Sequence, residues 1–326
     1  MIPDIWLQQA RERLTGKILQ TPLTYDHQFQ TYIKWENQQR TGSFKLRGAF
    51  NKILTLQPWE RERGLVAASA GNHGQGVALA GGMFGLPVTV FAPENTVPAK
   101  LEAMRTLGAE IHLVPGDYGA AERAGQAYAA GSGSTWISPY NDGQVIAGQG
   151  TLALEILDQL QAFPAASLEQ PITWIVPVGG GGLLAGIACA LFGDGRHDPV
   201  QHRLVAVQSE ASPFFYEIYQ RNTQEGVQEM PSLADGLAGP VETGSLTIPI
   251  LRRYTSDFVL VSEADIEQAI VYAWQKYSQK IEGSAATSLA GVLSNKVSAR
   301  PALAVISGGN IQPEVHQAIV TRLARA

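Results

Sequence analysis

A run of four consecutive glycines, residues 179–182, is the clearest candidate for a binding site in this chain. It follows an apolar run of strand type, 172–178, and precedes a helix-type run that begins at Leu183. A strand that turns into a helix leaves the first N–H groups of the helix without partners, and glycines leave those groups uncovered. Such a helix start binds a phosphate group. A flexible tight turn is the alternative, although such a turn needs only one or two glycines.

The second candidate is Lys45, which lies in a segment of mostly small and apolar residues, 41–49, directly after Phe44. Removal of a lysine from water lowers the pKa of its amine and favours the neutral form. The neutral amine is the form that reacts with a carbonyl to give a Schiff base. By residue type alone, an exposed lysine on a helix is the simpler interpretation, so this prediction depends on the other motifs.

Two short polar loops follow predicted strands. Residues 69–73 read Ser-Ala-Gly-Asn-His, and residues 307–310 read Ser-Gly-Gly-Asn. Small residues let backbone N–H groups approach an anion, and the amide of Asn72 is able to bond a phenolic oxygen. Proteins built on parallel sheets bind ligands in the loops at the carboxyl ends of their strands. For 69–73, a turn that caps a helix is an equally good interpretation.

Strand-type and helix-type segments alternate through most of the chain after Leu65. This alternation predicts an α/β protein with parallel sheets and crossover helices. Ser262, followed by Glu263 and Asp265, predicts a capped helix start. The predicted strands cover 65–68, 88–92, 111–114, 172–178, 204–208, 257–261 and 302–306. The predicted helices cover 73–83, 99–107, 120–130, 144–161, 213–221, 263–277 and 311–325, and a further one begins at Leu183.

Composition limits the partners of this chain. Its 326 residues are enough for two domains, and a net charge of −5 without a basic run argues against binding of nucleic acid. Residues 172–192 carry no charge and are long enough to span a bilayer, but Pro177 and the glycine run would break any helix there. We therefore expect no membrane partner. The first residues show no secretion signal, so we expect a cytoplasmic location.

The motifs, taken together and in this order, resemble the pyridoxal-phosphate (PLP) enzymes of the tryptophan synthase β fold, also called fold type II. Within that superfamily the chain is most similar to the serine/threonine dehydratases, or threonine ammonia-lyases, and to the serine racemases. Any one motif is weak evidence, but their shared order over nearly the whole chain is specific. The matching segments are Lys34, Glu36, Asn37, 42–49, 69–73, 148–151, 179–182 and 307–310.

The resemblance implies an α/β architecture of two domains with three-layer αβα organisation. The large, PLP-binding domain would comprise residues 1–66 plus 142–326, and the small, mobile domain would comprise residues 67–141. The cofactor would lie in the cleft between them, where closure of the small domain excludes water. Because the family usually forms dimers, we also expect a homodimer that acts on a small amino-acid substrate.

The resemblance also implies a role for each motif. Lys45 would be the catalytic residue, which holds PLP as a Schiff base and then removes the Cα proton of the substrate. Asn72 would bond the phenolic oxygen, and Ser307 would face the pyridine nitrogen, where a hydroxyl stabilises a pyridinium less than an aspartate does. The implied cofactor-binding residues are Phe44, Lys45, Asn72, Gly179, Gly180, Gly181, Gly182, Leu183 and Ser307. The implied substrate-binding residues are Ser69, Ala70, Gly71, Asn72 and His73.

The implied reaction is the dehydration of L-threonine or L-serine to a 2-oxo acid and ammonia. Racemisation needs a second acid/base on the opposite face of the cofactor, and the racemases carry a serine where this chain has Ala70. Gln208 and Phe214 stand where the racemases have carboxylates of a cation site, so we expect no metal. A serine racemase and a 3-hydroxyaspartate dehydratase remain alternatives. So do a β-replacement enzyme and a noncatalytic PLP-binding protein.

Overall fold

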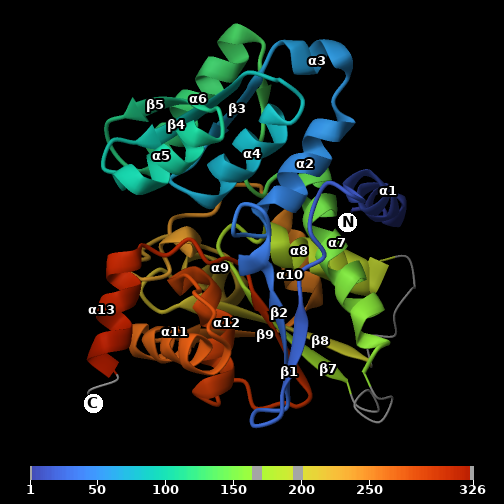
Figure 1. The fold of residues 1–326 in the computed structure, drawn as a ribbon, viewed down its shortest axis with the longest axis vertical. Coiled ribbons are helices and arrows are strands. Elements are labelled where there is room, and N and C mark those ends of the chain that lie inside the picture. Colours follow the sequence, from blue (N-terminus) through green and yellow to red (C-terminus); the bar gives the residue numbers. More distant parts are fainter. Residues whose placement is uncertain (1, 164–170, 194–200, 324–326) are drawn as a thin grey trace.

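The computed structural model describes residues 2–163, 171–193 and 201–323, which form two sheets with helices on both faces of each (Figure 1). The larger sheet has the strand order β1-β2-β10-β7-β8-β9, and the smaller has the order β5-β4-β3-β6. The predicted α/β class with parallel sheets is therefore confirmed. The larger sheet consists of β1 (Leu23–Asp26), β2 (Thr31–Trp35), β7 (Ile172–Pro177), β8 (His202–Ser209), β9 (Thr255–Val261) and β10 (Ala302–Ile306). The smaller consists of β3 (Leu65–Ala68), β4 (Val88–Pro93), β5 (Glu110–Val114) and β6 (Thr135–Trp136).

The larger sheet is parallel except for the antiparallel pair β1 and β2. Every residue of β7 and β10 is buried, as expected for central strands that are covered on both faces. One core packs the sheet against α1 (Asp4–Leu14), α7 (Gly143–Leu160), α8 (Gly182–Phe192), α9 (Phe214–Arg221) and α10 (Thr247–Tyr254). The other core packs it against α11 (Glu263–Tyr277), α12 (Gly283–Leu293) and α13 (Pro313–Leu323).

The smaller sheet is parallel throughout and lies above the larger one in Figure 1. Helix α6 (Tyr118–Ser132) covers one face, where Ala121 and Ala129 pack on β3 and β4. Helices α4 (Asn72–Gly82) and α5 (Pro98–Thr106) cover the other face and share a core with α2 (Lys45–Thr55). A short helix, α3 (Pro58–Glu62), leads from α2 to β3. Helix α2 therefore joins the two sheet units.

Local capping signals mark the starts of several helices. The Oγ of Ser262 accepts a hydrogen bond from the backbone N–H of Asp265 at 3.2 Å, and the Asp265 carboxylate accepts one from the Ser262 backbone, so the predicted cap of α11 is confirmed. Asp142 caps α7 by accepting from two backbone N–H groups. Gly133, with φ of +76°, ends α6 in the left-handed conformation that glycine adopts without strain.

The sequence pattern missed the elements that have short or mixed signals. No element was predicted before Leu65, yet α1, β1, β2 and α2 form there. Strands β1 and β2 contain polar or charged residues, such as Asp26 and Lys34, so no continuous apolar run marks them as it marks β3 and β10. Helix α12 is rich in alanine and serine and is buried all round, so it presents no polar face that would show helical periodicity.

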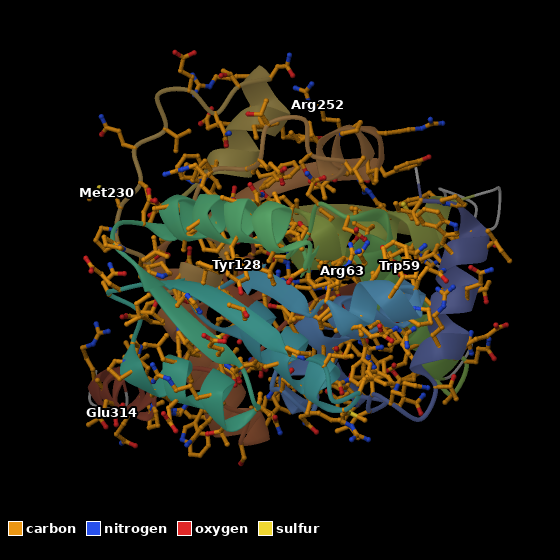
Figure 2. The ribbon with its side chains drawn as sticks, turned by 90° about the horizontal axis from the view of Figure 1, so that it is seen from above. Trp59, Arg63, Tyr128, Met230, Arg252 and Glu314 are labelled. Atoms are coloured by element: carbon orange, nitrogen blue, oxygen red, sulfur yellow. The ribbon has the colours of Figure 1, made fainter. Side chains whose placement is uncertain are left out.

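The uncharged segment 172–192 divides into the buried strand β7 and the buried helix α8, with the glycine run between them. Among the described residues, no helix has both the length and the apolar character to cross a membrane. Large apolar side chains at the surface are scattered over separate elements, as Trp59, Tyr128 and Met230 illustrate in Figure 2. Arg63 lies over the ring of Trp59, 5.5 Å from its centroid.

Candidate active site

The carboxyl ends of the central strands bring the predicted motifs together. Strands β7 and β10 are parallel neighbours, so the glycine run after β7 and the loop 307–310 after β10 lie at one edge of the larger sheet. Strand β3 ends directly before the loop 69–73. The loops of the two sheets meet through Asn72, which hydrogen bonds to Glu282 and Asn310 of the larger unit. A polar site thus forms between the two sheets.

Lys45 is the first residue of α2 and points into this region. Its Nζ donates to the backbone oxygen of Pro139 at 3.1 Å and lies 5.3 Å from the centre of the Phe44 ring. Burial lowers the pKa of Lys45 to about 8, although the carboxylate of Glu282 acts to raise it. The expectation of a depressed lysine pKa is confirmed. At neutral pH a usable fraction of this amine is therefore unprotonated.

The loop 69–73 forms the start of α4. Ser69 is buried, and its Oγ accepts from the N–H of Gly71 at 3.0 Å. Ala70 is partly exposed, and its side chain carries no polar atom. His73 is buried with its Nε2 2.8 Å from the oxygen of Ile137, and burial, followed by the charge of Lys45, lowers the pKa of His73 to about 3. His73 is therefore neutral at physiological pH.

The glycine run has close neighbours that the sequence did not reveal. A Cβ on Gly179 would lie 3.0 Å from the Cα of Leu237, and a Cβ on Gly180 would lie 2.3 Å from the ring of Tyr140. Gly181 has φ of +85° and is the cap of α8. Close packing therefore requires small residues here in addition to any need for uncovered N–H groups. The prediction that a structural turn needs fewer glycines is wrong for this site.

Ser307 and Leu183 occupy buried positions beside these loops. Ser307 follows β10 with 3% of its surface exposed, and its backbone oxygen accepts from the N–H of Phe44 at 3.1 Å. A bridge between Ser43 and Gly308 ties the same two segments together. Leu183 is the second residue of α8 and packs in the core of the larger sheet. The fold therefore fixes Ser307 directly next to the segment that carries Lys45.

Sequence reasoning missed Glu282, the residue before α12. Its Oε1 accepts from the Nδ2 of Asn72 at 2.7 Å. Burial, and secondly the nearby carboxylate of Asp235, raise the pKa of Glu282 to about 7. Its only sequence signal is a single carboxylate that precedes an uncharged helix, 283–293. Tyr140 was also missed, because its contact with the glycine run joins segments that are distant in sequence.

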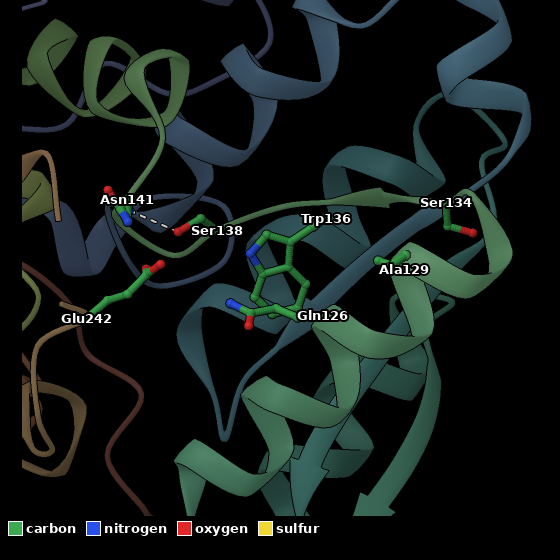
Figure 3. Close-up of a pocket in the computed structure, with 8 residues that line it drawn as sticks. Gln126, Ala129, Ser134, Trp136, Ser138, Asn141 and Glu242 are labelled. Carbon is green, nitrogen blue, oxygen red and sulfur yellow. Dashed lines mark hydrogen bonds between the residues drawn. The ribbon is translucent and has the colours of Figure 1, made fainter. Parts of the chain in front are cut away.

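A pocket of about 390 Å³ opens next to this region and is shown in Figure 3. It borders the segment 138–141, where the N–H of Asn141 donates to the Oγ of Ser138 at 2.9 Å. Glu242 and Trp136 also line it, but none of the predicted site residues do. Lys45 reaches the same segment through Pro139. The chemistry predicted from sequence is thus centred beside this pocket and not in it.

Comparison with known proteins agrees with this geometry. Residues 14–308 match the family model described as pyridoxal-phosphate dependent enzyme. The chain belongs to this family. The matched range includes Lys45, the glycine run and Ser307. It also confirms the resemblance inferred from the ordered motifs.

Curated relatives within this PLP-dependent family cover nearly the whole chain. The L-threonine ammonia-lyase of Thermotoga maritima is 36% identical over 323 residues, which are 97% of this chain and 77% of the relative. The catabolic L-threonine dehydratase of Escherichia coli is 36% identical over 313 residues, 93% of this chain and 91% of the relative. The first relative is named an ammonia-lyase and the second a dehydratase, and the first extends beyond the part that this chain matches.

Solved structures of PLP-dependent relatives confirm the fold. Maize serine racemase superposes with a TM-score of 0.85 at 26% identity, covering 100% of this chain and 99% of the racemase. Threonine deaminase isoform 2 from Solanum lycopersicum superposes with a TM-score of 0.84 at 28% identity, covering 99% of this chain and 94% of the deaminase. The fold is therefore that of fold type II PLP enzymes. Racemases and deaminases share it, so fold alone does not choose between them.

The residues present suit the cofactor of this family. PLP needs an amine that is unprotonated near neutral pH, a site for its phosphate and polar groups around its ring. Lys45 has a lowered pKa. The glycine run opens α8 at Gly181, where helix N–H groups lack partners within the helix. Ser307 and Asn72 supply a hydroxyl and an amide from the facing loops.

The positions discussed as a former cation site carry no carboxylate cluster. Gln208 is buried, and its Oε1 accepts from the N–H of Tyr216 at 3.1 Å. Phe214 is buried, whereas Glu210 is exposed to solvent. Within the described ranges, no group of three or more histidine, cysteine or acidic side chains is arranged to hold a metal ion.

Proposed function

We propose that this chain is a PLP-dependent dehydratase that converts L-threonine or L-serine to a 2-oxo acid and ammonia. The observation that carries the proposal is the amine of Lys45, whose pKa is lowered to about 8 by burial at the junction of the two sheets. The name of the relatives supports the substrate class, since L-threonine ammonia-lyases are 36–37% identical over 97–99% of this chain.

Each motif has a defined task in this proposal. PLP, when bound, supplies the electron withdrawal that makes the Cα proton of an amino acid acidic. Lys45 would hold the cofactor covalently, and its free amine would accept the Cα proton, so nucleophile and base would be one residue. Residues 179–182 and Leu183 would bind the phosphate at the start of α8, and Phe44 would pack against the ring. Ser307 would offer a neutral hydroxyl to the ring nitrogen.

The loop 69–73 binds the carboxylate of the substrate. The N–H of Ala70 lies near the start of α4, where Asn72 and His73 follow, whereas the N–H groups of Ser69 and Gly71 already donate to the oxygen of Phe91 and the Oγ of Ser69, each at 3.0 Å. The β-hydroxyl of the substrate would leave with its bonding electrons and one proton as water, and the proton that Lys45 has taken from Cα balances this step. The product that remains then hydrolyses to the 2-oxo acid and ammonia. His73 stays neutral throughout, which favours binding and not proton transfer.

Dehydration is favoured over racemisation by the chemistry of the same loop. Ala70 has no proton to donate, and the Oγ of Ser69 accepts from the N–H of Gly71. A racemase needs a donor on the second face of the substrate. Chiral analysis of unreacted L-serine distinguishes the two activities, since accumulation of D-serine faster than the 2-oxo acid would establish a racemase.

3-Hydroxyaspartate is the second candidate substrate because a cation lies near the carboxylate-binding loop. The side chain of Lys100 passes beside Gly71, and its Nζ pairs with Asp235 at 2.5 Å. A substrate with a second carboxylate would have to replace Asp235 as the partner of Lys100. Rates of 2-oxo acid formation with L-serine, L-threonine, D-serine and 3-hydroxyaspartate rank these candidates. Addition of a thiol, which would trap the unsaturated intermediate, tests for a β-replacement enzyme.

The domain and assembly predictions complete the proposal. Residues 67–141 form a small domain that closes on the larger one, 1–66 plus 142–326, and excludes water during elimination. The Lys100–Asp235 ion pair joins these two units, which supports it as a contact that forms when the small domain closes. We further propose a homodimer in the cytoplasm. Sedimentation of the purified protein tests the oligomeric state.

The central experiment replaces Lys45 by alanine. We expect loss of the visible absorption of the bound cofactor and loss of 2-oxo acid formation from L-threonine. Lys52→Ala is the matched control, since Lys52 lies on the same helix and pairs with Asp142 on α7's cap. Full turnover by Lys45→Ala would overturn the proposal. A cofactor-loaded wild type without turnover on any hydroxyamino acid would establish a noncatalytic PLP-binding protein.

A further inference from the structure

Glu282 is a buried residue whose carboxyl group does not cap the helix that it precedes. It occupies the cap position of α12, but its side chain makes no capping hydrogen bond there. Only 9% of its surface is exposed. Its Oε1 instead accepts from the Nδ2 of Asn72, a residue 210 positions away and on the other sheet unit. A long carboxylate at a cap position is thus directed into the site.

Hydrogen bonds fix this carboxylate and Asn72 in one orientation. The Nδ2 of Asn310 donates to the Oδ1 of Asn72 at 2.7 Å, which assigns the amide nitrogen of Asn72 to Glu282. The backbone N–H of Asn310 also bonds to Glu282, and the N–H of Glu282 donates to the oxygen of Gly308 at 3.2 Å. An amide nitrogen has two hydrogens, and the bond to Glu282 uses one. The other is held in a fixed direction.

Gly308 supports this arrangement. A Cβ at residue 308 would lie 2.3 Å from the Oε1 of Glu282 and 3.2 Å from the Nδ2 of Asn72. A side chain here would therefore push apart the carboxylate and the amide. The loop 307–310 thus accommodates the Glu282–Asn72 contact as well as placing Ser307.

Charged groups from three other segments, Asp235, Lys100 and Lys45, interact with Glu282. Asp235 raises its pKa after burial, and Lys100 acts to lower it. Lys45 on α2 responds to the charge of Glu282, and His73 on α4 responds to Lys45. Because the pKa of Glu282 is about 7 and that of Lys45 about 8, both groups titrate near neutral pH. Two interacting groups with such similar values titrate as a pair.

We propose that Glu282 is a positioning residue that holds the amide of Asn72 towards the cofactor and, by binding or releasing a proton, controls the charge carried at Lys45. This role rests on the proposed attachment of PLP to Lys45. Below neutral pH Glu282 is a neutral acid. As the pH rises the carboxylate forms and favours the protonated nitrogen at Lys45, so the positive charge there persists to higher pH.

The experiment is a pH titration of the visible absorption of the holoenzyme, without substrate. Glu282→Gln keeps the size of the side chain and a carbonyl that accepts from Asn72, but it carries no charge. We expect the midpoint of the titration to fall by about one pH unit, because a neighbouring negative charge no longer favours the protonated form. Glu314→Gln makes the same chemical change on the exposed face of α13 and should leave the midpoint unchanged. A midpoint in Glu282→Gln equal to that of the wild type would overturn the role.

Asp235→Asn tests the path of the effect. Asp235 acts on Glu282, so its removal should shift the titration of the wild-type protein but not that of the Glu282→Gln variant. An equal shift in both backgrounds would show that Asp235 acts on Lys45 directly and would contradict control through Glu282. These measurements need no turnover. A protein that binds PLP but fails to dehydrate threonine therefore refutes the proposed reaction without affecting this result.

A measurement on the wild type covers the case in which Glu282→Gln does not fold. Infrared difference spectra between pH 6 and pH 8 should show a buried carboxylic acid that loses its proton near the pKa of about 7. Glu282→Asp, which keeps the charge on a shorter side chain, should shift this band and identify its source. If no carboxyl group titrates in this range, Glu282 does not control the charge at Lys45.

Discussion

The first turn of helix α2 carries two cations in opposite circumstances, Lys45 at its first position and Arg47 two residues later. Arg47 is buried and bonds to carboxylates on two sides: Nε and Nη2 donate to Glu36, each at 2.8 Å, and Nη2 donates to Glu155 at 2.9 Å. Lys45, by contrast, donates to a backbone carbonyl. Arg47 therefore faces a matched set of carboxylates, whereas Lys45, on the same helix, faces almost none.

The environments change the pKa values in opposite directions. Burial acts to lower the pKa of Arg47, but Glu36 and Glu155 more than offset it and raise the pKa above its ordinary value. At Lys45 burial prevails and lowers the pKa to about 8. Lys34 shows that an ion pair does not always outweigh burial, since burial lowers the pKa of Lys34 although it pairs with Glu155 at 2.5 Å. A buried group with enough partners of opposite charge stays ionised near neutral pH. A group with few such partners can gain or lose a proton there.

The largest effect that would test this comparison is on stability. Arg47→Ala should lower the free energy of unfolding by about 3–5 kcal/mol, because it leaves the buried carboxylate of Glu36 without its ion-pair partner and removes one of the two cations that pair with Glu155. Lys45→Ala should cost much less, since that lysine has no carboxylate partner to abandon. Urea unfolding of the cofactor-free proteins measures both. If the two variants lose equal stability, the contrast between the two cations is wrong.

A second prediction concerns acid sensitivity at His73. Its pKa in the folded protein is about 3, against 6.5 for an ordinary histidine, so the unfolded state binds more protons between these values. Folding stability should therefore fall as the pH drops below 6.5, by about 1.4 kcal/mol for each pH unit. His73→Gln should make this slope shallower. Thermal unfolding from pH 7 to pH 4 measures this slope, and an equal slope in His73→Gln and the wild type would contradict the prediction.

The smallest stability effect is expected for an exposed ion pair that joins the two sheet units. Lys100→Ala should cost less than about 1 kcal/mol, because the side chain of Asp235 is 60% exposed to water. The same variant should raise KM for L-threonine several-fold, since the Lys100 stem lies beside Gly71 in the proposed carboxylate loop. Lys296→Ala, which breaks the pair with Asp265 away from that loop, should leave KM unchanged. Equal KM values would separate Lys100 from substrate binding.

Much of the fold after Leu65 was predictable because its signals are local. Strands β3 and β10 and helix α11 have the predicted boundaries, since apolar runs of strand length and the Ser262 cap need no distant partner. The elements before Leu65 were not predictable in this way. Strands β1 and β2 lack the wholly apolar runs of β3 and β10, and β2 is buried over its whole length, including Lys34. A buried lysine in a strand makes sense only beside Glu155, which is 121 residues away.

The candidate site divides along the same line. Lys45, the glycine run, Asn72 and Ser307 were found from residue type and from the order of the motifs, which survives in a sequence. Glu282 was not, because its importance depends on a contact with Asn72 across 210 residues. A carboxylate at a helix start is ordinary by type. Its burial, and the lack of a capping hydrogen bond from its side chain, are visible only in the folded structure.

The sequence by itself determined the family and the parallel α/β architecture, and it predicted the residues for the cofactor chemistry, because strand and helix signals and ordered motifs are properties of neighbouring residues. The tertiary structure decided which charged groups have partners of opposite charge, as Arg47 has. It also decided which groups have a pKa near neutral pH, as Lys45 and Glu282 have. It also added a second reason for the glycine run, the close approach of Tyr140 and Leu237. The matched charges, the shifted pKa values and the close packing at the glycine run have one physical cause. Burial and electrostatic environment depend on distant segments that only folding brings together.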